Sequence, residues 1–244
     1  MFTDDVLQSF NELDYVIYNT VLRTGDKLER MQVRDLADAA HVSPASVVRF
    51  CKKIGCKGYT EFRYRYCDSL KAVPARQSGD QSREIKTFLE NSHGAEFTRS
   101  AEKAVELLQA ASQIICVGVG ASSDLASFGA RMFSNVGHFS LCINDPFLSI
   151  PSFLAERPVV VAISFSGSTE QTVAMTKRFV ESGCKVISIT GSDKNPLAKI
   201  ADVNLSYYAR SIPIQGGYDL GTQVPALYIL ELLGRRLYAC GGGK

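Results

Sequence analysis

The chain has 244 residues, of which 45% are apolar and 21% charged, and its formal net charge is only +2. This length allows one or two domains with a large core, and the composition is that of an ordinary globular protein. No apolar run approaches the ~20 residues that span a bilayer, and the acidic start MFTDDVLQSF lacks the order of a signal peptide, so we expect a cytoplasmic protein without membrane contact.

The charge is unevenly distributed along the chain. Residues 1–42 hold eight acids and four bases, a net charge of −4, whereas residues 43–71 hold seven bases and two acids, a net charge of +5. A local basic patch indicates a docking surface for a polyanion. Charge alone nevertheless favours the plainer explanation, which is a solvated surface.

The chain contains seven cysteines but no C-x-x-C pair, and only three histidines. In a cytoplasmic protein such cysteines are typical of buried, reduced thiols rather than of ligands or disulfide bridges. We therefore predict no metal and no cofactor.

The predicted secondary structure is helical in the first part of the chain and mixed in the second, which predicts two domains. Residues 1–71 contain only helical patterns, and AVPARQSGD at 72–80 has the composition of a linker. In 81–244, two helical segments (about 82–91 and 95–111) precede an alternation of strands and helices, which ends in a long helix at about 219–239. The predicted strands are IICVGVG at 114–120, FSLCI at 139–143, VVVAIS at 159–164, KVISIT at 185–190 and VNLSYY at 203–208. Apolar strands that alternate with helices predict an α/β domain whose parallel sheet is covered on both faces.

Residues 34–55, RDLADAAHVSPASVVRFCKKIG, have the pattern of two short helices joined by a tight turn at 41–43. Ser43 can cap the second helix, and Pro44 fits its first position, where the missing N–H is unpaired anyway. The second helix should bury four residues at positions i, i+3, i+4 and i+7, namely Val47, Phe50, Cys51 and Ile54. Its outer face carries small residues at the start, suited to close approach to bases, and basic residues further on. This is a helix-turn-helix with a recognition helix for the major groove, and the predicted DNA contacts are Ser43, Ala45, Ser46, Arg49, Lys52 and Lys53.

The run SPASVVRFCKKIGCKGYTEFR resembles the N-terminal domain of the RpiR family of bacterial transcriptional regulators, and the resemblance covers residues 5–71. One departure is His41, where the family commonly has glycine. Because positive φ costs a side chain roughly 1 kcal/mol more than glycine, we expect slight strain in this turn.

Two further loops follow predicted strands and precede helices. The first, GVGASS at 118–123, lacks the third glycine of a dinucleotide fingerprint, because Ser123 stands there, so we do not predict NAD binding. The second, SFSGST at 164–169, places four hydroxyls within six residues. Either these hydroxyls merely cap the next helix, or they hold an anion, since a helix N-terminus offers free N–H groups and a positive dipole end.

This pair of loops resembles the SIS (sugar isomerase) domain, over about residues 105–240. The resemblance implies a three-layer αβα domain with a five-stranded parallel sheet of order 2-1-3-4-5. The family's two patterns match Gly118, Gly120 and Ser122 in the first loop, and Ser164, Ser166, Gly167 and Thr169 in the second. We expect a sugar phosphate to be held by Ser122, Ser123, Ser164, Ser166, Gly167, Ser168 and Thr169.

Together these features predict a DNA-binding regulator of sugar metabolism genes, a repressor controlled by a sugar-phosphate effector. It should act as a homo-oligomer, a dimer or tetramer, on a double-stranded operator. One alternative is an isomerase-type enzyme, but isomerases of this fold often carry Glu where Ser168 stands. Glu170, Glu231 and His138 are more simply surface or helix residues. A second alternative is a scaffold protein that binds no DNA, and failure to bind any duplex would favour it.

Overall fold

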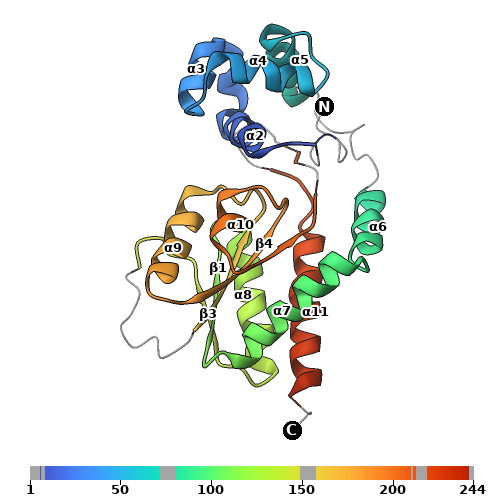
Figure 1. Ribbon diagram of the computed structural model, residues 1–244, viewed down its shortest axis with the longest axis vertical. Coiled ribbons are helices and arrows are strands. Elements are labelled where there is room, and N and C mark those ends of the chain that lie inside the picture. Colours follow the sequence, from blue (N-terminus) through green and yellow to red (C-terminus); the bar gives the residue numbers. More distant parts are fainter. Residues whose placement is uncertain are drawn as a thin grey trace. The chain divides into compact units, whose positions relative to one another are not determined.

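The computed structural model describes residues 6, 9–71, 81–148, 158–209, 211–212 and 219–241 (Figure 1). The chain divides into two compact units, Met1–Glu84 with Tyr208–Thr222 and Ile85–Tyr207 with Gln223–Lys244. The predicted linker at 72–80 lies outside the described residues. Among the described residues, no helix has the length and apolar character needed to cross a membrane.

The first unit is helical and is held together by an aromatic core. Its described elements are α2 (Glu12–Thr24), the 3-10 helix η1 (Gly25–Arg30), α3 (Val33–Ala39), α4 (Pro44–Lys53) and α5 (Tyr59–Lys71). Phe50 of α4 is fully buried, and its ring centroid lies 5.4 Å from that of Phe10 and 5.9 Å from that of Phe62. Burying rings of this size contributes several kcal/mol, so these contacts fix α4 against its neighbours.

The predicted helix-turn-helix is confirmed as α3, a turn and α4. Ser43 is the N-cap of α4, and its side chain accepts a hydrogen bond from the Ser46 N–H (3.1 Å), with Pro44 at the first position. The four predicted core residues of α4 are buried. His41 has a φ of 52°, the positive value that the turn was expected to impose on it.

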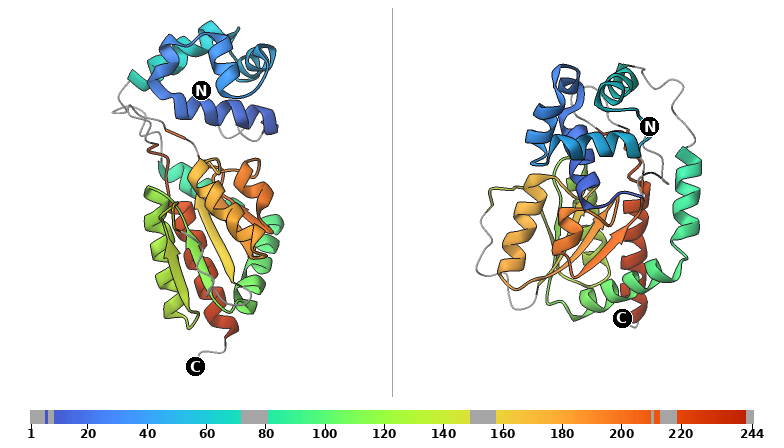
Figure 2. Two further views of the ribbon diagram at one scale, coloured as in Figure 1. Left: turned by 90° about the vertical axis from the view of Figure 1, so that its left-hand side faces the viewer. Right: turned by 45° about the horizontal axis from the view of Figure 1, so that its top comes forward.

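The second unit is a five-stranded, fully parallel sheet between helices, and the predicted order β2-β1-β3-β4-β5 is confirmed. The strands are β1 (Ile114–Val117), β2 (Ser140–Ile143), β3 (Val159–Ser164), β4 (Lys185–Thr190) and β5 (Val203–Ser206). The helices are α6 (Gln81–Asn91), α7 (Ala95–Ala110), α8 (Ala121–Asn135), α9 (Glu170–Glu181), α10 (Pro196–Ile200) and α11 (Val224–Cys240). Helices α7, α8 and α11 pack on one face of the sheet, and α9 and α10 pack on the other (Figure 2).

Three predicted elements were too long by two or more residues. The first strand ends at Val117, before the turn at Gly118, and the last ends at Ser206, because Tyr208 has a φ of 48° that a strand does not permit. The final helix begins at Val224 rather than near 219. The strands predicted at 159–164 and 185–190 have the observed bounds.

The strand order reverses between β1 and β3, which are paired in register from Ile114 opposite Val159 to Val117 opposite Ala162. From the carboxyl ends of these neighbours, one connection runs to α8 on one face and the other to α9 on the opposite face. Such a reversal leaves a crevice at the edge of the sheet, where ligands of open α/β sheets bind. Both predicted phosphate loops begin at this point.

Candidate functional site

The loop Ser164–Thr169 follows β3 and folds around its own hydroxyl groups. The Ser164 side chain is buried, and its Oγ accepts a hydrogen bond from the Gly167 N–H (3.1 Å) and lies 3.3 Å from the Thr169 Oγ1. Ser166 Oγ accepts from the Ser168 N–H (3.2 Å) and lies 3.5 Å from the same Thr169 Oγ1. The hydroxyls of Ser164, Ser166 and Thr169, all predicted phosphate contacts, therefore lie close together.

The position of Thr169 separates the two interpretations of this loop. Thr169 is the N-cap residue of α9, yet its side chain makes no capping hydrogen bond. A capping hydroxyl would accept from an N–H of the first turn, which otherwise has no partner within the helix. The Thr169 hydroxyl instead faces Ser164 and Ser166, so it does not satisfy the positive end of α9. This arrangement suits an anion better than a helix cap.

The first loop, after β1, depends on two glycines for its shape. A Cβ on Gly118 would lie 2.3 Å from the Ser122 carbonyl oxygen, and Gly120, the N-cap of α8, has a φ of 61°. The Ser123 hydroxyl donates to the Gly120 carbonyl (2.7 Å), whereas the Ser122 hydroxyl forms no hydrogen bond among the described residues. Of the two predicted serines, Ser122 has the available donor.

A third loop, Gly191–Asn195 between β4 and α10, supports the serine loop and was missed by the sequence analysis. The Gly191 N–H donates to the Phe165 carbonyl (2.9 Å), and the Leu197 N–H donates to the Gly167 carbonyl (3.0 Å). Asn195 is the N-cap of α10, with proline at the helix start. Asn-Pro after a strand is the signal that could have identified a third loop at this edge of the sheet.

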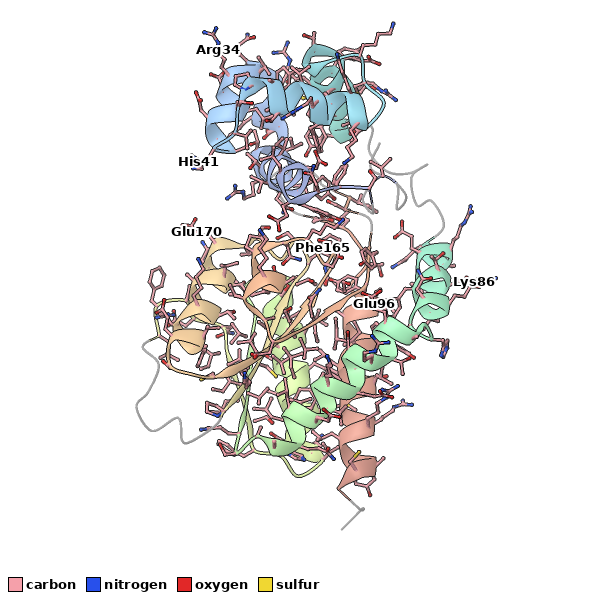
Figure 3. All side chains as sticks on the ribbon, in the orientation of Figure 1. Arg34, His41, Lys86, Glu96, Phe165 and Glu170 are labelled. Carbon is pink, nitrogen blue, oxygen red and sulfur yellow. The ribbon has the colours of Figure 1, made fainter. Side chains whose placement is uncertain are left out.

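The three candidate acid–base residues are not gathered at the serine loop. His138 precedes β2 and therefore lies at the amino ends of the strands, opposite the edge from which the loops leave. Glu231 lies within α11, 3.8 Å from Arg235. Glu170 is exposed at the start of α9 (Figure 3), and Ser168 occupies the position beside the loop glycine.

In the helical unit, α4 presents an exposed surface that includes Ala45, Arg49 and Lys52. Ser46 was expected on this surface, but that expectation was wrong, because only 7% of Ser46 is exposed. Its hydroxyl lies 2.9 Å from the Ser43 Oγ and accepts from the Arg49 guanidinium (3.1 Å). Ser46 thus connects the N-cap to Arg49 and orients that guanidinium, and its own contact with DNA stays a prediction.

Lys53 is engaged within the protein. Its Nζ donates to the Asp14 carboxylate (2.6 Å) and lies 5.9 Å from the centre of the Phe10 ring. The Asp14 side chain is only 10% exposed, so this pair joins α4 to α2 in a partly desolvated position. The expected phosphate contact of Lys53 stays a prediction that would require this ion pair to open.

We expect Lys53→Ala to destabilise the helical unit. The substitution leaves the nearly buried Asp14 carboxylate without its cation, and losing one partner of a buried pair costs ~1–3 kcal/mol. Urea unfolding of the full-length protein, followed by a signal from the helical unit, measures this loss. Lys52→Ala is the matched control, since Lys52 is the exposed neighbour, and equal stability of both variants would contradict the prediction.

Other cations of the basic segment are also bound within the unit. Arg63 donates to the Met31 carbonyl (3.0 Å), and Arg65 donates to the Gly55 carbonyl (3.4 Å) and lies 3.5 Å from Glu61. Lys57 is exposed near the start of α5 and was not predicted as a contact. Arg63 and Arg65 therefore keep their charge, but their guanidinium groups have partners within the unit.

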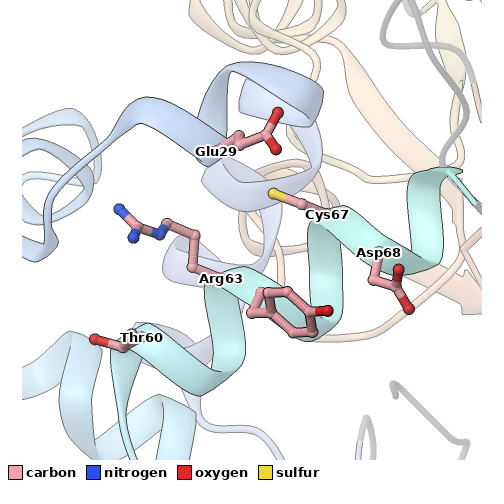
Figure 4. A pocket seen from close by; sticks show the side chains of 6 residues that line it. Glu29, Thr60, Arg63, Cys67 and Asp68 are labelled. Atoms are coloured by element: carbon pink, nitrogen blue, oxygen red, sulfur yellow. The ribbon is translucent and has the colours of Figure 1, made fainter.

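A separate hollow of about 340 Å³ lies between η1 and α5 (Figure 4). It is lined by side chains of both charges and one exposed aromatic ring: Glu29, Thr60, Arg63, Tyr64, Cys67 and Asp68. Two carboxylates beside one guanidinium give this hollow a lining that does not favour an anion.

The seven cysteines are free thiols. Five are buried, as expected, but Cys142 is half-buried and Cys240 is exposed near the end of α11. Burial raises the pKa of the Cys51 thiol to about 12, which keeps it protonated and unreactive near neutral pH.

Comparison with protein families matches both halves of the chain. Residues 4–72 match the family described as "Helix-turn-helix domain, rpiR family", and residues 107–223 match the SIS domain. The chain belongs to the RpiR family of transcriptional regulators. The RpiR and SIS resemblances seen in the sequence are thereby confirmed.

Two relatives of this RpiR-family chain match more than nine-tenths of its length, and a third matches a shorter part. A protein of Caldanaerobacter subterraneus subsp. tengcongensis, named an uncharacterized HTH-type transcriptional regulator, is 27% identical and covers 94% of this chain and 86% of its own length. A regulator of the same description from Thermotoga maritima is 28% identical, and the match covers 92% of this chain and 86% of the relative. A "Bifunctional protein glk" of Paraburkholderia xenovorans is 30% identical over 70% of this chain but only 29% of its own length.

Solved structures share the fold of this RpiR-family chain. The NanR protein of Vibrio vulnificus, solved in complex with ManNAc-6P, has a TM-score of 0.60 at 24% identity, covering 96% of this chain and 89% of NanR. The sugar isomerase domain of an RpiR transcription factor from Sphaerobacter thermophilus has a TM-score of 0.54 at 20% identity. The match covers 69% of this chain and 90% of that domain's chain.

Proposed function

We propose that this RpiR-family regulator is a cytoplasmic, homo-oligomeric repressor of sugar metabolism genes, and that a sugar phosphate bound at the loops after β1 and β3 controls it. The observation that carries the proposal is the Thr169 hydroxyl, which faces Ser164 and Ser166 and leaves the start of α9 uncapped.

The chemistry of the two loops fits a phosphate group. The helices α8 and α9 have 15 and 12 residues, so each presents unpaired N–H groups and a positive dipole end to the crevice. The hydroxyls of Ser122, Ser166 and Thr169 add neutral donors, and Gly167 allows close approach of the backbone. NanR binds ManNAc-6P, an amino-sugar phosphate, and this supports the same class of ligand here.

The exposed surface of α4 is the proposed DNA contact. Arg49 would read a base edge in the major groove, Ala45 would allow the helix to approach, and Lys52 would neutralise a phosphate. Two copies of the chain would occupy two half-sites of an operator, about one or more helical turns apart. The effector would shift DNA affinity only if it binds two arrangements of the oligomer unequally.

An isomerase activity finds little support in the arrangement of the carboxylates and the histidine. Proton transfer beside a carbonyl requires a base within hydrogen-bond reach of the substrate, and Ser168 stands beside the phosphate loop where a glutamate would serve. Turnover of a hexose 6-phosphate by the purified protein would contradict the proposed absence of catalysis.

A thermal-shift screen against a panel of sugar phosphates tests the effector proposal. A ligand present at 100 times its Kd stabilises the folded state by about 2.7 kcal/mol, which raises the melting temperature measurably. The unphosphorylated sugars and inorganic phosphate are the controls for each hit. Stabilisation by no phosphosugar, or equal stabilisation by the parent sugars, would contradict the proposal.

The salt dependence of binding to duplex DNA tests the role of Lys52. If Lys52 contacts one phosphate, Lys52→Ala should weaken binding to every sequence alike and lower the slope of log K against log salt by about 0.9. Lys103→Ala on α7 of the sheet unit is the matched control, and it should leave the slope unchanged. An unchanged slope for Lys52→Ala would remove this side chain from the interface.

A further inference from the structure

Asn195 lies beneath the serine loop and touches it from the neighbouring loop, Gly191–Asn195. Only 1% of Asn195 is exposed. Its side-chain Nδ2 donates to the Ser192 carbonyl (2.6 Å), and its Oδ1 accepts from the Ala198 N–H (2.8 Å). Because both ends of the amide are used, the side chain has one fixed orientation.

The fixed amide packs directly against Gly167 of the serine loop. A Cβ on Gly167 would lie 2.0 Å from the Asn195 Oδ1 and 2.1 Å from its Cγ, far inside van der Waals contact. Gly167 also has a φ of 61°, which side chains rarely adopt. Glycine is therefore required at this position on two independent grounds.

Backbone hydrogen bonds complete the support around this contact. The neighbouring loop and α10 donate N–H groups to the carbonyls of Phe165 and Gly167, so the acceptor side of these two peptides faces away from the crevice. The Thr190 hydroxyl donates to the Ser192 carbonyl (2.6 Å), which also receives the Asn195 amide. A binding site needs such a supporting shell to hold its donors within about 0.5 Å of the productive geometry.

We propose that Asn195 is a positioning residue of the phosphate site: it holds Gly167 and the following peptide so that the donors of the serine loop meet a bound phosphate. This inference rests on the proposed function. Asn195 is buried under the loop and would not touch the ligand itself. Without its amide, Gly167 loses its three nearest packing atoms and keeps a glycine's freedom to change conformation.

Two substitutions separate positioning from helix capping. Asn195→Ala removes both the N-cap of α10 and the packing under Gly167. Asn195→Ser restores a good N-cap but is too short to keep the contact with Gly167. We expect the serine variant to recover most of the lost melting temperature, whereas both variants weaken phosphate binding about tenfold, the loss equivalent to about one hydrogen bond.

The probe is inorganic phosphate, titrated into the full-length protein and followed by the amide NMR signals of Gly167 and Ser168. These signals should move on binding in the wild type, and their starting positions should already be displaced in both Asn195 variants. Asp202→Ala is the matched control, since it removes a bond to Lys185 (2.6 Å) and one to the Val186 N–H (2.9 Å) at the opposite ends of the strands. It should lower stability and leave phosphate affinity unchanged.

The outcomes distinguish this inference from the proposed function. If the wild-type signals do not respond to phosphate, the proposed phosphate site is overturned and the positioning role with it. If the wild type responds and Asn195→Ser binds phosphate as tightly, the site stands and the positioning role is overturned.

A second measurement compares melting temperatures to test the contact between Gly167 and Asn195. Gly167→Ala alone must displace the Asn195 amide. In the double variant Gly167→Ala, Asn195→Ala the three atoms that the new methyl group would meet most closely are absent. We expect the double variant to melt at a higher temperature than Gly167→Ala alone. Additive losses of melting temperature would show that the two residues do not depend on each other.

Discussion

Replacing both Ser166 and Thr169 by alanine should abolish the response of this regulator to the proposed sugar-phosphate effector while preserving the fold. Each hydroxyl is expected to donate a hydrogen bond to a charged oxygen, a contribution of ~1.5–3 kcal/mol. Each single replacement should therefore raise the dissociation constant ~10- to 150-fold. Calorimetric titration of the wild type, both single variants and the double variant measures this change.

The structure also predicts that the Ser166→Ala, Thr169→Ala variant loses little stability. A lost helix cap costs ~1 kcal/mol, but the Thr169 side chain makes no capping bond to α9, so this cost should be absent. Ser182→Ala is a matched control at the other end of α9, where the hydroxyl donates to the Arg178 carbonyl (2.9 Å) and no ligand is expected. Lower stability of Ser166→Ala, Thr169→Ala with an unchanged dissociation constant would support the capping interpretation and overturn the phosphate cradle.

Operator binding provides a separate readout for the same double variant. Because the proposed DNA surface lies on α4, the variant should bind its operator as tightly as the wild type when no effector is present. Linkage requires that a ligand that no longer binds can no longer shift DNA affinity. Electrophoretic mobility shifts with and without the phosphosugar test both statements, and a lost operator affinity would contradict the separation of the two roles.

The second large effect is expected at Arg49. If its guanidinium pairs with a guanine edge, Arg49→Ala should weaken operator binding by ~1–3 kcal/mol, which is ~5- to 150-fold, and relax the preference at one base pair. The bond to Ser46 supports this role, since it holds the guanidinium in one orientation before DNA arrives. Binding to a set of operators with single-base changes measures both effects.

Arg65→Ala is the control for Arg49, because Arg65 lies in the same unit but is bonded to the Gly55 carbonyl and lies beside Glu61. It should leave base preference intact. If Arg49→Ala weakens all sequences equally, Arg49 contacts a phosphate and does not read a base. If Arg49→Ala changes nothing, α4 is not the recognition helix.

The sequence by itself determined the elements of this protein wherever burial is uniform or periodic. The strands at 159–164 and 185–190 have the predicted bounds, because a central parallel strand is covered on both faces and reads as a continuous apolar run. The helix-turn-helix was equally clear, since Ser43, Pro44 and the spacing of Val47, Phe50 and Ile54 all specify the same helix. These signals come from residues that are close together in the sequence, so one sequence is enough to predict the elements from them.

Only the tertiary structure decided what the individual polar side chains do. Helical spacing placed Lys53 and Ser46 on the outer surface of α4, yet Lys53 bonds to Asp14, 39 positions away, and Ser46 is buried between Ser43 and Arg49. Asn195 was not recognised at all, although it packs against Gly167 in another loop. The reason is physical: periodicity records which face of an element is apolar, whereas the partner of a buried hydroxyl, amide or charge depends on segments that become neighbours only when the chain folds.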